Sequence, residues 1–139
     1  IIYWPEVINQ SSEIDETVSF VDWFPTLLSI AGIKDKEDLI LRGRNILPLL
    51  KKVALDWNNE LYAEFINLRS YRTPDWKLVL DFSENPIHEL YDLNKDKNEK
   101  YNLYNSKRND IVKIKQDLQQ KLITKMKEIN DPLLNTIIH

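Results

Sequence analysis

The chain has 139 residues, of which 42% are hydrophobic and 29% are charged, a composition typical of a globular chain and not of a disordered one. Its 19 basic and 22 acidic residues leave a net charge of −3, so it lacks the basic character that nucleic-acid binding needs. There is no cysteine, which excludes disulfides, thiolate metal sites and cysteine nucleophiles within these residues. No apolar run approaches the ~20 residues of a membrane-spanning helix, so we expect neither a membrane span nor a nucleic-acid partner.

The first part of the chain predicts a strand followed by a helix. The run IIYWPEVI, residues 1–8, is rich in aromatic and β-branched residues and is typical of a strand that ends near Pro5. The segment VDWFPTLLSIAGIK predicts a helix over residues 22–31, because Asp22 can cap its start and Gly32 can adopt the left-handed conformation that ends a helix. The chain opens on this apolar run without an initiator Met, so we expect it to be a fragment.

The next stretch, residues 34–52, predicts a surface connection with a tight turn at Gly43. We predict neither a helix nor a strand for it. Its apolar pairs are expected to attach it to the core: Ile46-Leu47 and Leu49-Leu50.

From Glu60 onward the hydrophobic period changes to that of short strands. Four segments of strand length alternate or are rich in aromatic residues: ELYAEFI, SYRT, WKLVLDF and HELYDL. Their short connections contain turn-forming residues, which favours an antiparallel sheet. One face of the third segment is apolar throughout and therefore needs a cover; it carries Trp76, Leu78, Leu80 and Phe82.

The last long segment predicts the helix that covers this sheet. Its apolar residues recur at spacings of three and four: Ile111, Ile114, Leu118, Leu122, Met126 and Ile129. Asn105 or Ser106 can cap its start, and Asp131-Pro132 ends it. Before the helix, NKDKNEK turns the chain off the sheet edge, and we expect Tyr101 and Leu103 to pin that turn.

Five elements, in this order, resemble the C-terminal end of an arylsulfatase-type sulfatase of the alkaline phosphatase superfamily. A strand like residues 1–8 is followed by V-D-x-x-P-T-L-L-x-x-A-G, which residues 21–32 match at every fixed position. A G-x-x-L-x-P-L-L-like element follows at residues 43–50. The motif R-x-x-R-T-x-x-x-K then matches residues 69–77, and E-L-Y-D-L-x-x-D-x-x-E-x-x-N-L matches residues 89–103. The family's usual Pro in that last motif is replaced by Lys97, which loosens the turn.

The resemblance implies an α+β fold in two parts. Residues 1–55 would be the end of a main α/β domain of the alkaline-phosphatase type, with its last strand (1–8), a helix (22–31) and a connection. Residues 56–139 would be a C-terminal subdomain, a small four-stranded antiparallel sheet covered by a long amphipathic helix.

The resemblance also implies a parent protein that hydrolyses sulfate esters, with sulfated carbohydrates as the expected substrates. In this family a formylglycine, made from Cys or Ser in Cys/Ser-x-Pro-x-Arg, attacks sulfur while calcium neutralises the sulfate. Neither Ser11 nor Ser12 is followed by that motif, and no acidic pair has the setting of a calcium ligand set. We therefore expect no catalytic residue, metal ligand or cofactor in this chain, and expect the formylglycine and calcium upstream of it.

Three residues are candidates for substrate binding. The guanidinium forks of Arg69 and Arg72 suit a sulfate or carboxylate on a sugar. The alternative for both is an ion pair across the sheet with Asp75, Glu89 or Asp92, which we favour. Trp57, flanked by polar residues, is expected to be exposed and to contact substrate or a partner. His88 starts a strand without an acid–base partner, so we expect a structural or solvated role for it.

Two other functions compete with the sulfatase. A phosphatase or phosphodiesterase of the same superfamily would differ in its nucleophile and metals, which would also lie upstream. A free-standing interaction module would instead fold stably alone. If the sulfatase hypothesis is right, the expected partners are the upstream catalytic domain and a sulfate-ester substrate, and residues 1–50 are short of contacts and can self-associate. Such parent proteins are expected to be periplasmic, secreted or otherwise exported, although these residues do not indicate the cellular compartment.

Overall fold

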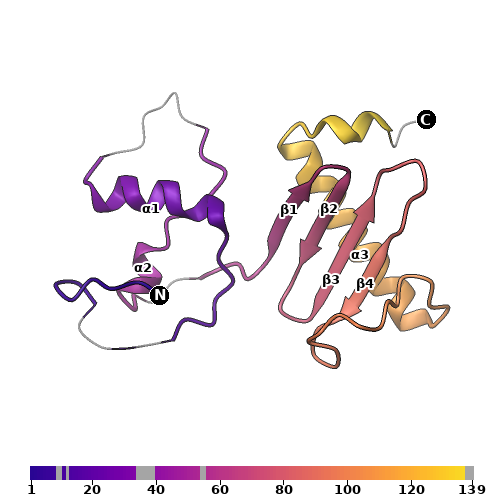
Figure 1. The fold of residues 1–139 in the computed structure, drawn as a ribbon, viewed down its shortest axis with the longest axis horizontal. Coiled ribbons are helices and arrows are strands. Elements are labelled where there is room, and N and C mark those ends of the chain that lie inside the picture. The colour runs from indigo at the N-terminus through magenta and orange to yellow at the C-terminus, as the bar shows by residue number, and fades with distance from the viewer. Residues whose placement is uncertain (9–10, 12, 34–39, 54–55, 137–139) are drawn as a thin grey trace. The chain divides into compact units, whose positions relative to one another are not determined.

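The structure, a computed structural model, describes residues 1–8, 11, 13–33, 40–53 and 56–136. It divides into two compact units, residues 1–59 (unit 1) and residues 60–139 (unit 2), each of which is described by itself. The sequence placed the corresponding boundary after residue 55. Figure 1 shows the helices of unit 1 and the sheet with its helix in unit 2.

Unit 2 contains the predicted four-stranded antiparallel sheet. Its strands are β1 (Leu61–Phe65), β2 (Leu68–Arg72), β3 (Trp76–Asp81) and β4 (Glu89–Asp92), and they neighbour one another in chain order. Short connections force this order, since two residues separate β1 from β2 and the pair Phe65–Leu68 closes that hairpin. The α+β prediction is confirmed.

Helix α3 (Asn109–Glu128) runs along one face of the sheet and covers its apolar side chains, as predicted (Figure 1). The core of unit 2 joins alternate residues of β3 and β4 to one face of α3; its buried members are Leu78, Leu80, Leu90, Ile111, Leu118, Leu122 and Met126. Trp76 and Phe82 pack against this cluster, so the predicted dry face of β3 is confirmed. The helix begins at Asn109 with Arg108 as its N-cap residue, so neither Asn105 nor Ser106 occupies the cap position.

The chain between β4 and α3 folds back along β4. The N–H of Leu103 donates to the carbonyl of Leu90 at 2.8 Å. The side-chain carbonyl of Asn102 accepts from the N–H groups of Leu90 and Tyr104, and its amide donates to the carbonyl of His88. The prediction that Tyr101 pins this turn is wrong, because Tyr101 is exposed and Asn102 supplies the polar contacts.

Unit 1 differs from its prediction at the start of the chain. Residues 1–8 form no strand; a turn occupies Pro5–Val7, where the N–H groups of Val7 and Ile8 donate to the carbonyl of Trp4. A strand needs a neighbouring strand to pair with, and none of the described residues pairs with this segment. Its composition alone therefore does not make it a strand.

The predicted helix of unit 1 is present as the 3₁₀ turn η1 (Phe20–Asp22) and helix α1 (Trp23–Ile30). It ends as predicted, with Gly32 at φ +70°, and the N–H of Ile33 donates to the carbonyl of Leu28. Asp22 precedes α1 but does not cap it. Its carboxylate instead accepts from the N–H groups of Ser19 and Arg44.

Residues Leu47–Leu50 form a short helix, α2, which the sequence did not predict. Three buried residues make the small core of unit 1: Ile46, Leu49 and Leu50. The side chain of Thr26 holds this segment against α1, since its hydroxyl accepts from the N–H of Ile46 and donates to the carbonyl of Asp22. A Cβ on Gly43 would lie 1.9 Å from the carbonyl oxygen of Val21, so only glycine allows this close approach.

Candidate functional site

Arg69 lies inside unit 2, on the face of the sheet that α3 covers. Its Nε and one terminal nitrogen donate to the two carboxylate oxygens of Asp131, at 2.5 and 3.1 Å. The other terminal nitrogen donates to the carbonyls of Ile66 and Leu68. Only 6% of the Arg69 side chain is exposed. The guanidinium of Arg69 is fully engaged within unit 2, so the structure shows the ion pair that was the alternative to substrate binding. Its partner is Asp131 and not one of the acids named from the sequence.

Asp131 reaches Arg69 because of how α3 ends. Asn130 adopts φ +53°, and the N–H of Asp131 donates to the carbonyl of Met126, which turns the chain back toward the sheet. The hydroxyl of Tyr62 donates to the same carboxylate at 2.7 Å. Burial raises the pKa of Asp131, but the hydrogen bonds from Arg69 and Tyr62 outweigh it and hold the pKa at about 2. Burial and this hydrogen bond raise the pKa of Tyr62.

Arg72 lies on the opposite face of the sheet from Arg69, as the alternation of a strand requires. Its cross-strand neighbour on β3 is Lys77, and both side chains approach the carboxylate of Glu99. Lys77 makes a close ion pair at 2.5 Å, while the guanidinium of Arg72 stays 3.9 Å away. We name these three residues the Arg72–Lys77–Glu99 cluster. The ion pair expected for Arg72 is present, but its partner is Glu99 and not one of the acids named from the sequence.

Tyr91 is the residue of β4 that pairs with Lys77, and it is buried. Burial raises the pKa of its hydroxyl, and the nearby carboxylates of Glu89 and Glu99 add to the effect. The Arg72–Lys77–Glu99 cluster therefore lies beside a buried aromatic residue. It is accessible to solvent at Arg72, where 45% of the side chain is exposed.

Trp57 is half-buried, so the prediction that it is exposed is wrong. Its indole packs against the small core of unit 1 and donates to the carbonyl of Thr17 at 3.0 Å. The guanidinium of Arg44 lies over the ring, 4.0 Å from its centroid, and also pairs with Asp22. The flanking polar residues misled the prediction: Asn58 and Asn59 use their polar groups to hold Arg44 and Thr17.

His88 has a structural role. Its Nδ1 accepts from the N–H of Asp81 at 3.1 Å, and its ring lies against Tyr104 at 4.8 Å. These contacts fix the connection between β3 and β4, in agreement with the role that we favoured from the sequence.

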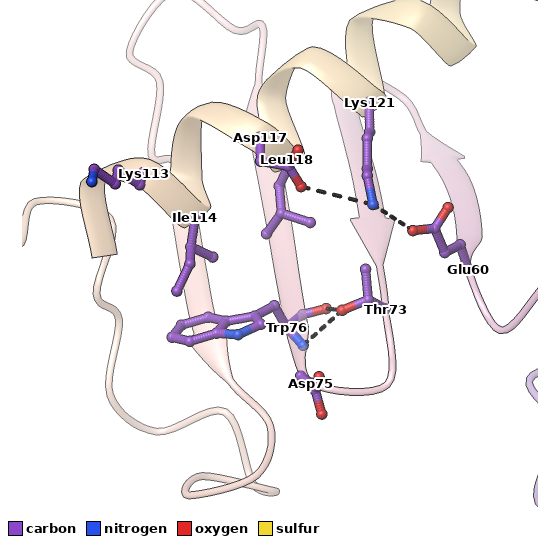
Figure 2. A pocket seen from close by; sticks show the side chains of 9 residues that line it. All are labelled: Glu60, Thr73, Asp75, Trp76, Lys113, Ile114, Asp117, Leu118 and Lys121. Carbon is purple, nitrogen blue, oxygen red and sulfur yellow. Dashed lines mark hydrogen bonds and ion pairs between the residues drawn. The ribbon is translucent and has the colours of Figure 1, made fainter. Parts of the chain in front are cut away.

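Unit 2 also has a shallow groove of about 490 Å³ between α3 and the connection of β2 to β3 (Figure 2). Figure 2 shows apolar side chains along it, Trp76, Ile114 and Leu118, with charged groups at its margin. Three of those groups are engaged with one another, because Lys121 bridges Glu60 and Asp117. Glu60 also accepts from the hydroxyl of Tyr71. The groove lies where α3 packs against the sheet. We assign no ligand to it.

Among the described residues there is no group of three or more His, Cys, Asp or Glu side chains that could hold a metal ion. The same part of the chain has no helix long and apolar enough to cross a membrane. Asp92 and Asp96, two acids of the last motif, have local roles: Asp92 accepts from the N–H groups of Asn94 and Lys95, and Asp96 accepts from that of Tyr101. These are turn contacts.

The family of N-sulphoglucosamine sulphohydrolase C-terminal domains matches residues 1–128 of the chain. The chain belongs to this family. The resemblance to the C-terminal portion of a sulfatase of the alkaline phosphatase superfamily is thus confirmed. Within this sulfatase domain, the motif residues Asp22, Thr26 and Gly43 hold unit 1 together, as the contacts described above show.

Two curated relatives are sulfatases. The chain is 32% identical over 131 residues to an uncharacterised sulfatase, YidJ, of Escherichia coli K12, covering 89% of this chain and 25% of that protein. It is 29% identical over 143 residues to an N-acetylglucosamine-6-O-sulfatase of Bacteroides thetaiotaomicron, covering 94% of this chain and 25% of that protein. The chain thus spans about a quarter of the length of each.

A solved structure has the same fold. It is a protein in complex with its substrate, D-glucosamine-2-N,6-O-disulfate, and it is 26% identical to this chain with a TM-score of 0.68. The match covers 80% of this chain and 24% of that protein.

The structure does not bring the three candidate substrate-binding residues into one site: Arg69 and Arg72 lie on opposite faces of the sheet, and Trp57 lies in unit 1. It also shows partner residues that the sequence did not single out. Asp131 was predicted only as a helix end, and Lys77 and Glu99 only as motif positions. The spacing of Arg72 and Lys77 about a short turn could have indicated that they face each other across a hairpin.

Proposed function

We propose that the complete protein containing this sulfatase domain is a sulfuric ester hydrolase that cleaves sulfate esters of carbohydrates. The family match over residues 1–128 carries this proposal. Two comparisons support a carbohydrate as the substrate. One relative is an N-acetylglucosamine-6-O-sulfatase, and one solved neighbour binds a disulfated glucosamine as its substrate.

This chain supplies structure to that enzyme and does not carry out the chemistry. We place the calcium and the formylglycine expected of such an enzyme in the part of the protein upstream of this chain, because the chain spans about a quarter of the length of its sulfatase relatives. No step of the reaction is assigned to residues of this chain. Its role is to complete the fold and to shape the substrate cleft.

The upstream catalytic domain of the same polypeptide is the proposed partner of unit 1. One face of α1 and its surroundings is apolar and exposed; it includes Phe20, Val21, Phe24, Leu27 and Ile30. A helix with an uncovered apolar face gains stability when another surface removes it from water. Without that domain, we expect residues 1–50 to self-associate. We also expect the complete protein to be exported.

Among the substrate-binding candidates, Arg72 retains the geometry for contact with a ligand, because 45% of its side chain is exposed. Trp57 offers only part of its ring, since Arg44 and the small core of unit 1 take the rest. Arg69 is enclosed, so its contribution to substrate binding would be indirect, through the rigidity of β2.

The proposal is tested by assaying the complete protein on 4-nitrophenyl sulfate and on sulfated glucosamines, beside phosphate monoesters and diesters. We expect turnover of sulfate esters, loss of activity when calcium is chelated, and a formylglycine detectable by mass spectrometry. Turnover of phosphate esters alone, without formylglycine, would show a phosphatase of the same superfamily instead.

The role of unit 1 has a separate test. Hydrogen exchange on the 139-residue chain should show slow exchange in the sheet and α3, and fast exchange in α1 and α2. Slow exchange throughout residues 13–53 in a monomer would favour the free-standing interaction module.

A further inference from the structure

Two cations face each other directly in the sheet of unit 2. Arg72, the last residue of β2, and Lys77, the second residue of β3, are cross-strand partners on the face that α3 does not cover. Like charges in this position destabilise an antiparallel pair. The arrangement therefore needs an anion to offset it.

The anion that this chain provides serves the two cations unequally. Glu99 accepts from the ammonium of Lys77, but its other oxygen stays 3.9 Å from the guanidinium of Arg72. No hydrogen bond joins the Arg72 side chain to any described residue. One carboxylate thus balances two cations and leaves the donors of Arg72 facing solvent.

Glu99 also occupies a backbone conformation that costs free energy. Its φ is +53°, in the left-handed region that residues other than glycine rarely adopt. Such conformations persist where surrounding contacts enforce them, and they gather at ligand-binding positions.

Three other arginines of the described chain differ from Arg72 in how their donors are used. Arg69 and Arg44 each donate at least three hydrogen bonds within their units. Arg108, although 68% exposed, donates to both carboxylate oxygens of Asp110. Among these four arginines, Arg72 is the one for which the only contact of the guanidinium given within the described residues is a long ion pair, with Glu99 at 3.9 Å.

We propose that the Arg72–Lys77–Glu99 cluster is a recognition site for an anionic group of the substrate, a sulfate or carboxylate. The guanidinium of Arg72 would bind two oxygens of that group, because its fork matches such groups in a bidentate manner. Lys77 would contribute its charge, and Glu99 is the internal counter-ion that the ligand displaces. This inference rests on the proposed function and adds to it a preference for substrates with more than one anionic group.

The test compares two ligands that differ by one anionic group. D-glucosamine-2-N,6-O-disulfate and D-glucosamine-6-O-sulfate are titrated into the complete protein by calorimetry, and their KM values are measured. The wild-type protein should prefer the disulfate. Arg72→Ala should reduce that preference about tenfold, the scale of one lost hydrogen bond to a charged group.

Three further variants distinguish recognition from folding. Arg72→Lys keeps the charge without the fork and should restore part of the preference. Glu99→Gln removes the competing anion and should strengthen disulfate binding. Arg108→Ala removes another exposed arginine and should change nothing. Denaturation midpoints of all variants are measured to show that each is folded.

The outcomes separate this inference from the proposed function. Equal losses on all substrates in Arg72→Ala, or no change on any, would overturn the inference while leaving the enzyme a sulfatase. If the complete protein turned over no sulfate ester, the proposed function would fail. The titration would still decide on the cluster, since loss of a disulfate preference in Arg72→Ala would uphold an anion site and absence of that preference in the wild type would exclude it.

Discussion

The two units of this sulfatase domain are stabilised in different ways. Unit 2 has a continuous core in which Leu78, Leu90, Leu122 and Met126 are fully buried between the sheet and α3. The described part of unit 1 has three buried apolar side chains in its core, while α1 exposes about half of Phe24 and of Leu27, at 53% and 54%. A strand pattern with a covering helix closes its own core, whereas a single helix and its connections do not.

Unit 1 relies on polar contacts where unit 2 relies on burial. The side chains of Asp22 and Thr26 join the start of the helical region to the segment before α2, because they accept from the N–H groups of Arg44 and Ile46. The side chain of Arg44 donates in turn to the carbonyl of Thr17. Such contacts fix geometry, but each contributes only about 1 kcal/mol. Unit 2 should therefore resist perturbation on its own, and unit 1 should gain most of its stability from a covering surface.

The largest effect is expected from Asp131→Ala in unit 2. It leaves the guanidinium of Arg69 charged, buried and without its carboxylate, and breaking a buried pair in this way costs about 3–5 kcal/mol. Urea denaturation followed by circular dichroism measures the loss. Glu128→Gln removes the exposed pair with Lys125 and should cost less than about 1 kcal/mol. Equal effects of the two variants would show that Arg69 is not buried in solution.

The next largest effect is expected from a substitution in the core of unit 2, compared with one on the exposed face of α1 in unit 1. Leu122→Ala removes a side chain with no exposed surface and should lower the free energy of unfolding by roughly 2–5 kcal/mol. Leu27→Ala in α1 should change it by less than about 1 kcal/mol in the 139-residue chain, because half of that side chain is already exposed. In the complete protein the effect of Leu27→Ala should grow. If it does not, the apolar face of α1 is not covered by the rest of the protein.

The sequence was most informative where structure depends on near neighbours. The alternation in β3 and the spacing of three and four in α3 reflect which face of each element is buried, so strands, helix and core followed from the pattern. The antiparallel arrangement of the sheet followed as well, because short connections with turn-forming residues join the strands.

Contacts between distant residues could not be read in the same way. Arg69 and Asp131 are 62 positions apart, and nothing in a motif says which acid meets which arginine. The small helix α2 was missed because Pro48 and the apolar pairs gave no helical period in four residues. Residues 1–8 have strand composition, but pairing decides whether a strand forms. The substrate-binding roles of Arg72, Arg69 and Trp57 stay predictions.

A smaller effect is expected from pH, and it should appear in unit 2. The pKa of Asp131 is held at about 2, below its ordinary value of 3.8. A carboxyl with a lowered pKa stabilises the fold above its unfolded pKa, and this contribution is lost as pH falls from about 4 to about 2. The loss amounts to about 2 kcal/mol for a shift of this size. Denaturation of wild type and Asp131→Asn between pH 5 and pH 2 isolates it, since the variant should lack this part of the pH dependence. Parallel curves would mean that the pKa is not lowered.

The smallest effect tests whether α1 is formed before anything covers it. Gly32 has φ +70°, and a Cβ added there would meet no atom within 4 Å, so Gly32→Ala adds backbone strain without a clash. The cost should be about 1 kcal/mol, and Gly32→Asn should cost less, since Asn tolerates this conformation better. In unit 2 the equivalent residue after α3 is Asn130, and Asn130→Gly should be nearly neutral. Thermal melting of the three variants measures these differences. If Gly32→Ala has no effect in the 139-residue chain but destabilises the complete protein, then α1 acquires its fixed end only when the covering surface is present.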